Sequence, residues 1–470
     1  MSPSYRIEHD FLGEKQLDDR LYYGVQTARA LENFHITGIP IAKEPLLIKA
    51  FAYVKKAAAR ANQELGVLDA RLAEAISHAC DRLVAGELLD QFPSDMIQGG
   101  AGTSVNMNVN EVIANLGLEY LGHRKGDYQY LHPNNHVNFS QSTNDAYPTA
   151  LRLALYWKIG AYVETLDALA AAFADKGVAF RNVLKMGRTQ LQDAVPMSLG
   201  EEFTGFALTL REDVARLREA QGSMQESSMG ATAIGTGINA PEGYAARCTH
   251  YLSELSGVPM TLSPNLIEAT SDTGAFVHVS GVLKRSALKL SKICNDLRLL
   301  SSGPRAGLHE INLPPLQPGS SIMPGKVNPV VPEVVNQTAF YVVGADVTIS
   351  FAAEAGQLQL NVMEPVMAFS LFTSLGYMTS ACHTLRTRCV EGITANEAEC
   401  RRQVMNSVAL VTALTPLLGY ETTAAIAKEA LATGRSVHAI VVEERKLLTQ
   451  AKWDELYSFE NLIRPRFIKA

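Results

Sequence analysis

The amino-acid sequence predicts a mostly α-helical protein in which a central bundle of five long helices is flanked by two smaller domains. Three observations support this prediction. The chain has 470 residues, enough for about three domains. Hydrophobic residues make up 47% of it, which allows a large core. Long apolar stripes at helical spacing fill its middle part, whereas strand-like alternation is scarce.

Five segments carry the pattern of the bundle helices. Apolar residues recur at steps of three and four from Leu151 to Phe173, which is one face of a long helix. Similar stripes run from Phe203 to Leu217 and from Val279 to Leu300, and residues 333–351 and 365–385 supply two more helices. The last segment lacks charge over 21 residues, but Ser, Thr and His interrupt it. A buried bundle helix is therefore favoured over a membrane span.

The domain boundaries follow from the ends of this pattern. Residues 1–141 are expected to mix short helices with loops, 142–394 to form the bundle, and 395–470 to form several short helices around Pro416 and Gly434. Several bundle helices are apolar on more than one face. Because a helix with two apolar faces needs more than one packing partner, we expect a homo-oligomer.

Charge and cysteine content exclude some classes of function. The net charge of −6 and a pI near 6.0 give no basic surface for nucleic acid or anionic membrane. Six widely spaced cysteines without a Cys-x-x-Cys pair predict buried free thiols in a reducing compartment. Arg6, Glu8 and Asp10 occupy the place of an apolar leader, so we expect a cytoplasmic protein. No metal-ligand motif is present, and no metal site is predicted.

Two glycine-rich segments resemble nucleotide-binding motifs only in part. Gly235–Ala240 fits Gly-x-Gly-x-x-Ala, but polar residues rather than a buried strand precede it. In Gly319–Lys326, five residues separate the glycines where a phosphate-binding loop has four, and Val327 replaces the Ser or Thr that would bind magnesium. A nucleotide-binding module is therefore a weak alternative.

Chemistry-bearing residues gather in three polar stretches. The first is Gly99–Asn108, and the second is Gln141–Asp145, extended by Gly187–Gln190 before the next long helix. Hydroxyl, amide and backbone N–H groups at helix N-termini favour anion binding. Capping explains a single Ser or Thr, but not four consecutive polar residues. The third stretch, Gly319–Pro329, has two glycines, two serines and a lysine, which is typical of a mobile loop that closes over a ligand.

The third stretch also resembles a known protein family. Gly-Ser-Ser-Ile-Met-Pro-Gly-Lys-Val-Asn at 319–328 is similar to the signature loop of the fumarase/aspartase superfamily, and the other polar stretches resemble its remaining blocks in the same order. The resemblance covers essentially the whole chain. It implies a three-domain helical subunit whose five-helix bundles form the core of a tetramer, with each active site shared by three subunits. It also implies elimination from a succinyl-type substrate to release fumarate, without an organic cofactor.

The family's reaction removes a proton from the carbon next to a carboxylate, and that carboxylate then becomes doubly negative. Hydrogen-bond donors must stabilise this charge, and the loss of one donor costs about 3 to 4 kcal/mol. The resemblance implies that Ser320 is the general base. It implies that the carboxylate gaining charge is held by Thr103, Ser142, Thr143 and Ser321. The other carboxylate would be held by Thr189, Lys326 and Asn328. The α-amino group would be bound by Asn144 together with Thr103, Thr143 and Gln190.

Gln190 indicates whether the leaving group is ammonia or hydroxide. In the family's fumarate hydratase and several related lyases this position is usually histidine. A glutamine, unlike a histidine, cannot relay protons. Hydroxide leaves poorly without an acid, whereas an ammonium group departs as neutral ammonia. Residues 330–337 and 356–365 also resemble the aspartase version of those segments. The sequence therefore favours an ammonia-lyase that converts L-aspartate to fumarate. The alternatives are a class II fumarase acting on malate and an inactive structural protein on the same scaffold.

Three features stay open at this point. Glu333 resembles the acid that partners the hydratase histidine, or it caps the helix after Pro332. His132–Asn135 resembles a secondary anion site of the hydratase, although a structural loop is favoured. Activation by a divalent cation is compatible with the sequence.

Overall fold

The computed structural model describes residues 4–464, which are mostly helical. The chain divides into two compact units. Unit 1 comprises the described residues up to 164 together with 215–287 and 340–379. Unit 2 comprises 165–214, 288–339 and the described residues from 380 onward. Strands within the described residues form only two-stranded sheets, in line with the predicted scarcity of strand patterns.

The N-terminal part of unit 1 is more regular than expected. It begins with the antiparallel strands β1 (Tyr5–Asp10) and β2 (Gly13–Asp18). Four helices follow: α1 (Val25–Asn33), α2 (Pro45–Glu64), α3 (Ala70–Val84) and α4 (Thr103–Tyr120). The expectation of short helices was wrong for α2 and α4, because both are buried on nearly all sides and lack the polar face that makes a helix easy to recognise.

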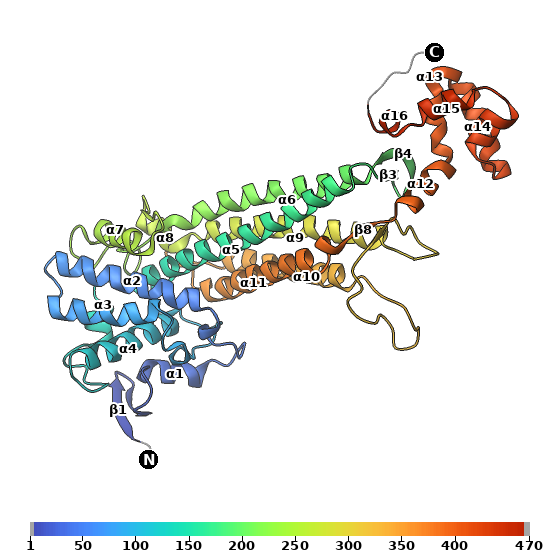
Figure 1. Cartoon of the computed structure of the whole chain (residues 1–470). Helices are drawn as coiled ribbons and strands as arrows, with labels where there is room; N and C mark the ends of the chain where they lie inside the picture. Colours follow the sequence, from blue (N-terminus) through green and yellow to red (C-terminus); the bar gives the residue numbers. More distant parts are fainter. Residues whose placement is uncertain (1–3, 465–470) are drawn as a thin grey trace. The chain divides into compact units, whose positions relative to one another are not determined.

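The five long helices predicted for the middle of the chain are confirmed. They are α5 (Thr143–Ala179), α6 (Leu199–Gly222), α9 (Gly274–Leu300), α10 (Val330–Glu354) and α11 (Glu364–Arg388). Within each unit they pack side by side, and α7 (Tyr244–Ser256) and α8 (Leu266–Ser271) belong to unit 1 (Figure 1). The apolar stripe of α5 from Leu151 to Phe173 is buried. None of the helices among residues 4–464 has the length and apolarity needed to cross a membrane.

Polar contacts fix how the bundle helices align. In unit 1, Asp346 of α10 accepts hydrogen bonds from Ser280 (2.8 Å) and Lys284 (2.6 Å) of α9. In unit 2, the amide of Asn336 on α10 donates to the hydroxyl of Ser291 on α9 at 2.8 Å. Each bond is worth about 1 kcal/mol net, but a shifted alignment would leave these buried groups without partners.

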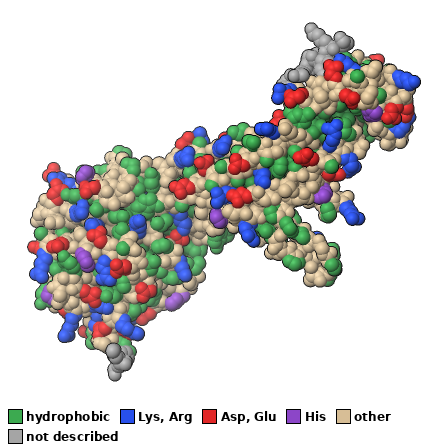
Figure 2. Space-filling view, in the orientation of Figure 1, with side chains coloured by type: hydrophobic (Ala, Val, Ile, Leu, Met, Phe, Trp, Pro, Cys, Tyr) green, Lys and Arg blue, Asp and Glu red, His purple; other side chains and the backbone are tan. Residues whose placement is uncertain are grey.

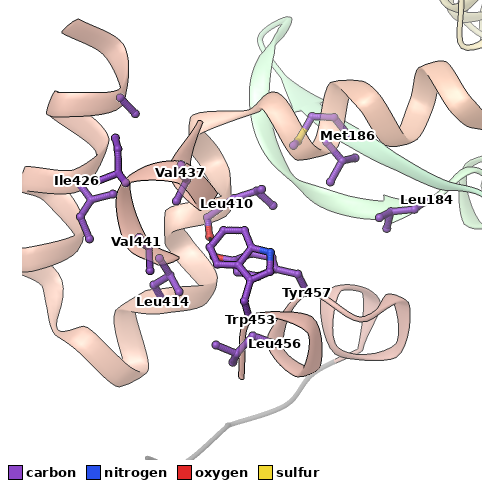
Figure 3. Close-up of a cluster of buried hydrophobic side chains, with 13 residues drawn as sticks. Leu184, Met186, Leu410, Leu414, Ile426, Val437, Val441, Trp453, Leu456 and Tyr457 are labelled. Carbon is purple, nitrogen blue, oxygen red and sulfur yellow. Dashed lines mark hydrogen bonds between the residues drawn. The ribbon is translucent and has the colours of Figure 1, made fainter. Parts of the chain in front are cut away.

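Unit 2 contains a hairpin that the sequence did not predict. Strands β3 (Leu184–Thr189) and β4 (Gln192–Ser198) pair antiparallel ahead of α6. Leu184, Lys185 and Met186 are all buried, so the alternation that marks a half-exposed strand is missing. Leu184 and Met186 pack into the same hydrophobic cluster as Leu410, Trp453 and Tyr457 (Figure 3).

The rest of this cluster comes from residues 404–457. Part of it lies in the short helical segments Val408–Leu414 and Ala439–Glu444. The α-helices of this C-terminal part are α12 (Glu397–Asn406), α13 (Thr415–Leu418), α14 (Tyr420–Thr433), α15 (Gln450–Leu456) and α16 (Phe459–Ile463). These short helices match the expectation for residues after 395. Two-residue strands complete the fold: β5 (Glu226–Ser227), β6 (Thr261–Leu262), β7 (Ile311–Asn312) and β8 (Thr394–Ala395). The hairpin β3–β4 thus shares a core with the C-terminal helices.

The distribution of surface charge and the state of the cysteines agree with what the composition predicted. On the face drawn in Figure 2, acidic and basic side chains are interspersed, and neither sign gathers into a large patch. The six cysteines are buried and form no disulfide, as the sequence predicted. Among residues 4–464, no group of three or more His, Cys, Asp or Glu side chains could hold a metal ion.

Glu364, the first residue of α11, gives a testable dependence of stability on pH. It is 7% exposed, and its carboxylate makes no hydrogen bond or ion pair with another described residue. Burial raises its pKa from 4.5 to about 8. An unfolded glutamate loses its proton near pH 4.5 while the folded one keeps it, so this group makes the fold less stable as the pH rises from about 4.5 to 8.

Glu364→Gln is therefore expected to change the stability little at pH 5 and to stabilise the protein by about 1 to 3 kcal/mol at pH 8. Thermal unfolding of both proteins at the two pH values measures this difference. Glu354→Gln, at an exposed position of α10, is the control and should show no such pH dependence. An equal effect of Glu364→Gln at both pH values would contradict the assignment.

Candidate active site

The turn before α4 presents Thr103 at the start of a helix. Gly100, Ala101 and Gly102 all have positive φ angles, of 91°, 57° and 90°. A Cβ atom on Gly102 would lie 2.2 Å from the ring of Tyr147, so only glycine fits there. Thr103 is exposed, and its hydroxyl donates to the carbonyl of Gly100 at 2.7 Å. The polar stretch Gly99–Asn108 thus contains the start of α4.

The start of α5 orders a second set of polar groups. The N–H of Ser142 donates to the carboxylate of Asp145 at 2.9 Å. The hydroxyl of Thr143 accepts a hydrogen bond from Asn106 of α4 at 3.0 Å, and the side-chain amide of Asn144 donates to a loop carbonyl at 2.8 Å. Unit 1 thus brings the first two polar stretches into direct contact.

A buried lysine lies beneath these groups. Lys55 of α2 is fully buried, and its ammonium group donates to Asn106 (2.6 Å), Asn138 (2.9 Å) and Gln141 (2.9 Å). Burial lowers its pKa to about 7. The sequence analysis missed Lys55, although its place one turn after Phe51 on the buried side of α2 was a usable signal.

Asp145 completes this layer. It is fully buried and accepts the N–H groups of Gly230 (3.2 Å) and Thr232 (2.9 Å) as well as that of Ser142. Burial raises its pKa to about 6, against the effect of these hydrogen bonds and of Lys55. Asp145 therefore ties the start of α5 to the loop around residue 230.

In unit 2, Thr189 and Gln190 lie at the tip of the hairpin β3–β4 rather than at a helix N-terminus. The expectation of a helix N-terminus there was wrong, because α6 begins only at Leu199. Thr189 pairs with Gln192, and the two residues of the turn have positive φ angles, 54° at Gln190 and 63° at Leu191. All four side chains are exposed. Asn or Gly normally occupies such a turn, so this tip holds a strained backbone.

The strain at Leu191 can be measured. Its side chain is exposed, so Leu191→Gly removes little packing, and it relieves a left-handed conformation that costs about 1 to 2 kcal/mol. The greater flexibility of unfolded glycine offsets about 0.5 to 1 kcal/mol of this gain. We expect the variant to be as stable as the parent or slightly more stable in thermal unfolding. Leu191→Val should be destabilised, and the opposite order would contradict the turn geometry.

Ser320 belongs to a loop, residues 313–329, that contains neither helix nor strand. Its hydroxyl oxygen accepts the N–H groups of Ile322 (3.2 Å) and Met323 (3.1 Å). At the neck of the loop, the N–H of Gly319 donates to the carbonyl of Lys326 at 2.6 Å, and Asn328 donates to the carbonyl of Gly319 at 2.7 Å. Ser320 and Lys326 line a cavity of about 470 Å³ in unit 2.

The predicted site residues are therefore divided between the two units. Unit 1 contains one group, Thr103, Ser142, Thr143 and Asn144. Unit 2 contains the other, Thr189, Gln190, Ser320, Ser321, Lys326 and Asn328. Within unit 1 the structure joins the two polar stretches through Asn106 and Thr143. Ser321 and Lys326 are exposed on the loop.

Glu333 and His132, whose roles the sequence left open, lie in or beside helices. Helix α10 begins at Val330, so Pro332 lies in its first turn and Glu333 follows it inside the helix. The prediction of a helix that starts after Pro332 was wrong by three residues, because proline is tolerated in a first turn. His132 caps the short helix Pro133–Val137 by accepting N–H groups of Asn134 and Asn135. Burial lowers the pKa of His132.

Comparison with known families agrees with this geometry. The family model described as "Lyase" matches residues 13–344, and the model described as "Fumarase C C-terminus" matches residues 410–464. The chain therefore belongs to the fumarase/aspartase superfamily of lyases.

Individual relatives point to one branch of the family. The chain is 58% identical to aspartate ammonia-lyase of Helicobacter pylori strain J99 over 464 residues, 99% of each chain. It is 53% identical to that of Escherichia coli K12 over 468 residues, 99% of this chain and 98% of the relative.

Solved structures agree on the fold. The fumarate lyase:delta crystallin of Brucella melitensis bound to cobalt has 51% identity and a TM-score of 0.96, covering 98% of this chain and 100% of that one. A class II fumarase of Schistosoma mansoni has 33% identity and a TM-score of 0.91, covering 97% and 98%. The helical fold is thus that of fumarate lyases.

Proposed function

We propose that the chain is an aspartate ammonia-lyase, which eliminates ammonia from L-aspartate reversibly to give fumarate. The observation that carries this proposal is the match to aspartate ammonia-lyases at 53–58% identity over nearly the full length, against 33% for the class II fumarase. Gln190 supports the same choice, since an ammonium group needs no acid to leave and a glutamine supplies none.

Ser320 is the general base of this proposal. It takes a proton from carbon 3 of L-aspartate, and the electron pair moves into the neighbouring carboxylate. The C–N bond then breaks, and neutral ammonia leaves. Serine is a weak base unless its charged form is stabilised. The N–H groups of Ile322 and Met323 already point at its oxygen and would favour the alkoxide.

The remaining site residues hold the substrate. Hydroxyl and amide donors at the starts of α4 and α5 bind the carboxylate that becomes doubly negative and the amino group. These donors are Thr103, Ser142, Thr143 and Asn144. Ser321 and Gln190 add to them from the loop and the hairpin tip. Thr189, Lys326 and Asn328 bind the other carboxylate. Donors that are ordered before the reaction stabilise the developing charge without reorganising, as the contact between Asn106 and Thr143 illustrates.

The active oligomer in this proposal is a cytoplasmic homotetramer whose sites combine segments of three subunits. The exposed apolar side chains on α10 support association, since Phe340 is 65% and Phe351 70% exposed in the single chain. Mixing Ser320→Ala with Asn144→Ala subunits tests the shared site. Each variant alone should be inactive, and refolded mixtures should regain activity only if one site takes its residues from different chains.

The activity test compares substrates. Ammonia release from L-aspartate, and fumarate formation from L-aspartate and from malate, distinguish an ammonia-lyase from a fumarase. We expect turnover of L-aspartate and none of malate. Turnover of malate alone would favour the fumarase, and no turnover of either would favour the inactive scaffold. The aspartate assay repeated with EDTA and with added Mg²⁺ measures activation by a divalent cation.

A further inference from the structure

A buried carboxylate outside the proposed catalytic set joins three elements of unit 2. Glu310 has no exposed surface and directly precedes β7, which leads into the loop of Ser320. Its carboxylate forms ion pairs with Arg188 and with Lys185 (2.9 Å), both on β3. Arg188 is the residue immediately before Thr189. One side chain thus contacts the strand that ends at the hairpin tip.

The third element is helix α12. The backbone carbonyl of Glu310 accepts the N–H of Asn396 at 2.9 Å, next to α12. Gln403 of α12 accepts a hydrogen bond from Arg188 at 2.7 Å and donates to the carbonyl of Leu308 at 2.6 Å. Arg188 is therefore held from two sides, by Glu310 through one nitrogen and by Gln403 through the other.

Electrostatics make this arrangement rigid. A buried carboxylate is costly unless it is paired, and removing one partner of a buried pair leaves an uncompensated charge. Burial alone would lower the pKa of Lys185, but Glu202 and Glu310 outweigh it and the pKa is raised. The planar guanidinium of Arg188 fixes direction as well as distance, so the strand cannot slide without breaking contacts.

We propose that Glu310 is a positioning residue of the lyase reaction: through Arg188 it sets where the hairpin presents Thr189 and Gln190 relative to the base of the Ser320 loop. The inference rests on the proposed function and extends it. Because Thr189 and Gln190 contact substrate in that proposal, a small displacement of the tip raises KM and lowers kcat/KM. Misplacement by about 1 Å can cost about a hundredfold in rate.

The test compares Glu310→Gln with the parent in aspartate turnover. Glutamine keeps the shape and an acceptor for Arg188 but removes the charge. We expect KM for L-aspartate to rise about tenfold or more. The thermal unfolding temperature should fall, because Lys185 and Arg188 lose a buried counter-charge, while the variant stays folded with the parental oligomeric state. The matched control is Asp346→Asn in unit 1, a buried carboxylate paired with Lys284, which should leave KM unchanged.

A double-mutant cycle separates positioning from general stabilisation. If Glu310 acts through the hairpin tip, Glu310→Gln should change KM less than about twofold in a Thr189→Ala, Gln190→Ala background. Equal fold-changes in both backgrounds, or an unchanged KM in the single variant, would overturn the proposal. An inactive parent protein would instead overturn the proposed function.

A second variant covers a failure of Glu310→Gln to fold. Gln403→Met removes the other acceptor of Arg188 without leaving a buried charge unpaired. It should raise KM in the same direction by a smaller factor, and this increase should also vanish in the Thr189→Ala, Gln190→Ala background. A folded Gln403→Met protein with parental KM would count against the role of the Arg188 anchor.

Discussion

Ser320→Ala is expected to lower kcat for L-aspartate by about 10²- to 10⁴-fold, because it removes the proposed general base. The fold should be little affected. Ser320 belongs to a loop, and its hydroxyl only accepts two backbone N–H groups within that loop. Steady-state rates of fumarate formation measure the loss.

Isotope exchange measures the proton-removal step directly. In D₂O, the parent protein should exchange a hydrogen on carbon 3 of L-aspartate during turnover, and Ser320→Ala should lose exchange and elimination together. Thermal unfolding and oligomeric state serve as controls and should match those of the parent. A variant that keeps more than about a tenth of the parental kcat would remove Ser320 as the base.

Lys326→Ala should act mainly on substrate binding. A hydrogen bond between charged groups is worth about 1.5 to 3 kcal/mol, so we expect KM for L-aspartate to rise by about ten- to a hundredfold. In the proposed site the ammonium group of Lys326 binds the carboxylate that does not change charge in the reaction, so kcat should change much less. Initial rates over a wide range of substrate concentration give both constants.

Lys428→Ala is the matched control for Lys326→Ala. Lys428 is exposed on α14 and has no place in the proposed site. Its removal changes the net charge equally but should leave KM at the parental value. If both variants raise KM by the same factor, general electrostatic attraction rather than a contact from Lys326 explains the effect.

The bundle was predictable because each long helix buries one continuous stripe. The stripe from Leu151 to Phe173 lies on α5, and the second and third stripes lie on α6 and α9. The polar stretches at Thr103 and Ser142 were also recognisable, since they crowd donors at helix starts. The hairpin at 184–198 was not, because three consecutive buried residues hide a strand's alternation.

The sequence by itself determined the helical stripes, the polar blocks and the loop of Ser320, because these depend on neighbours within about one or two turns of chain. Only the tertiary structure decided that Lys55 lies beneath Asn106, that Gln190 occupies a strained hairpin tip, and that Glu310 holds Arg188. The hairpin tip was hidden because three consecutive buried residues mask the alternation of its strand. For Lys55 and Glu310, burial and pairing of the charge depend on residues more than 50 positions away. No local pattern records such a partner.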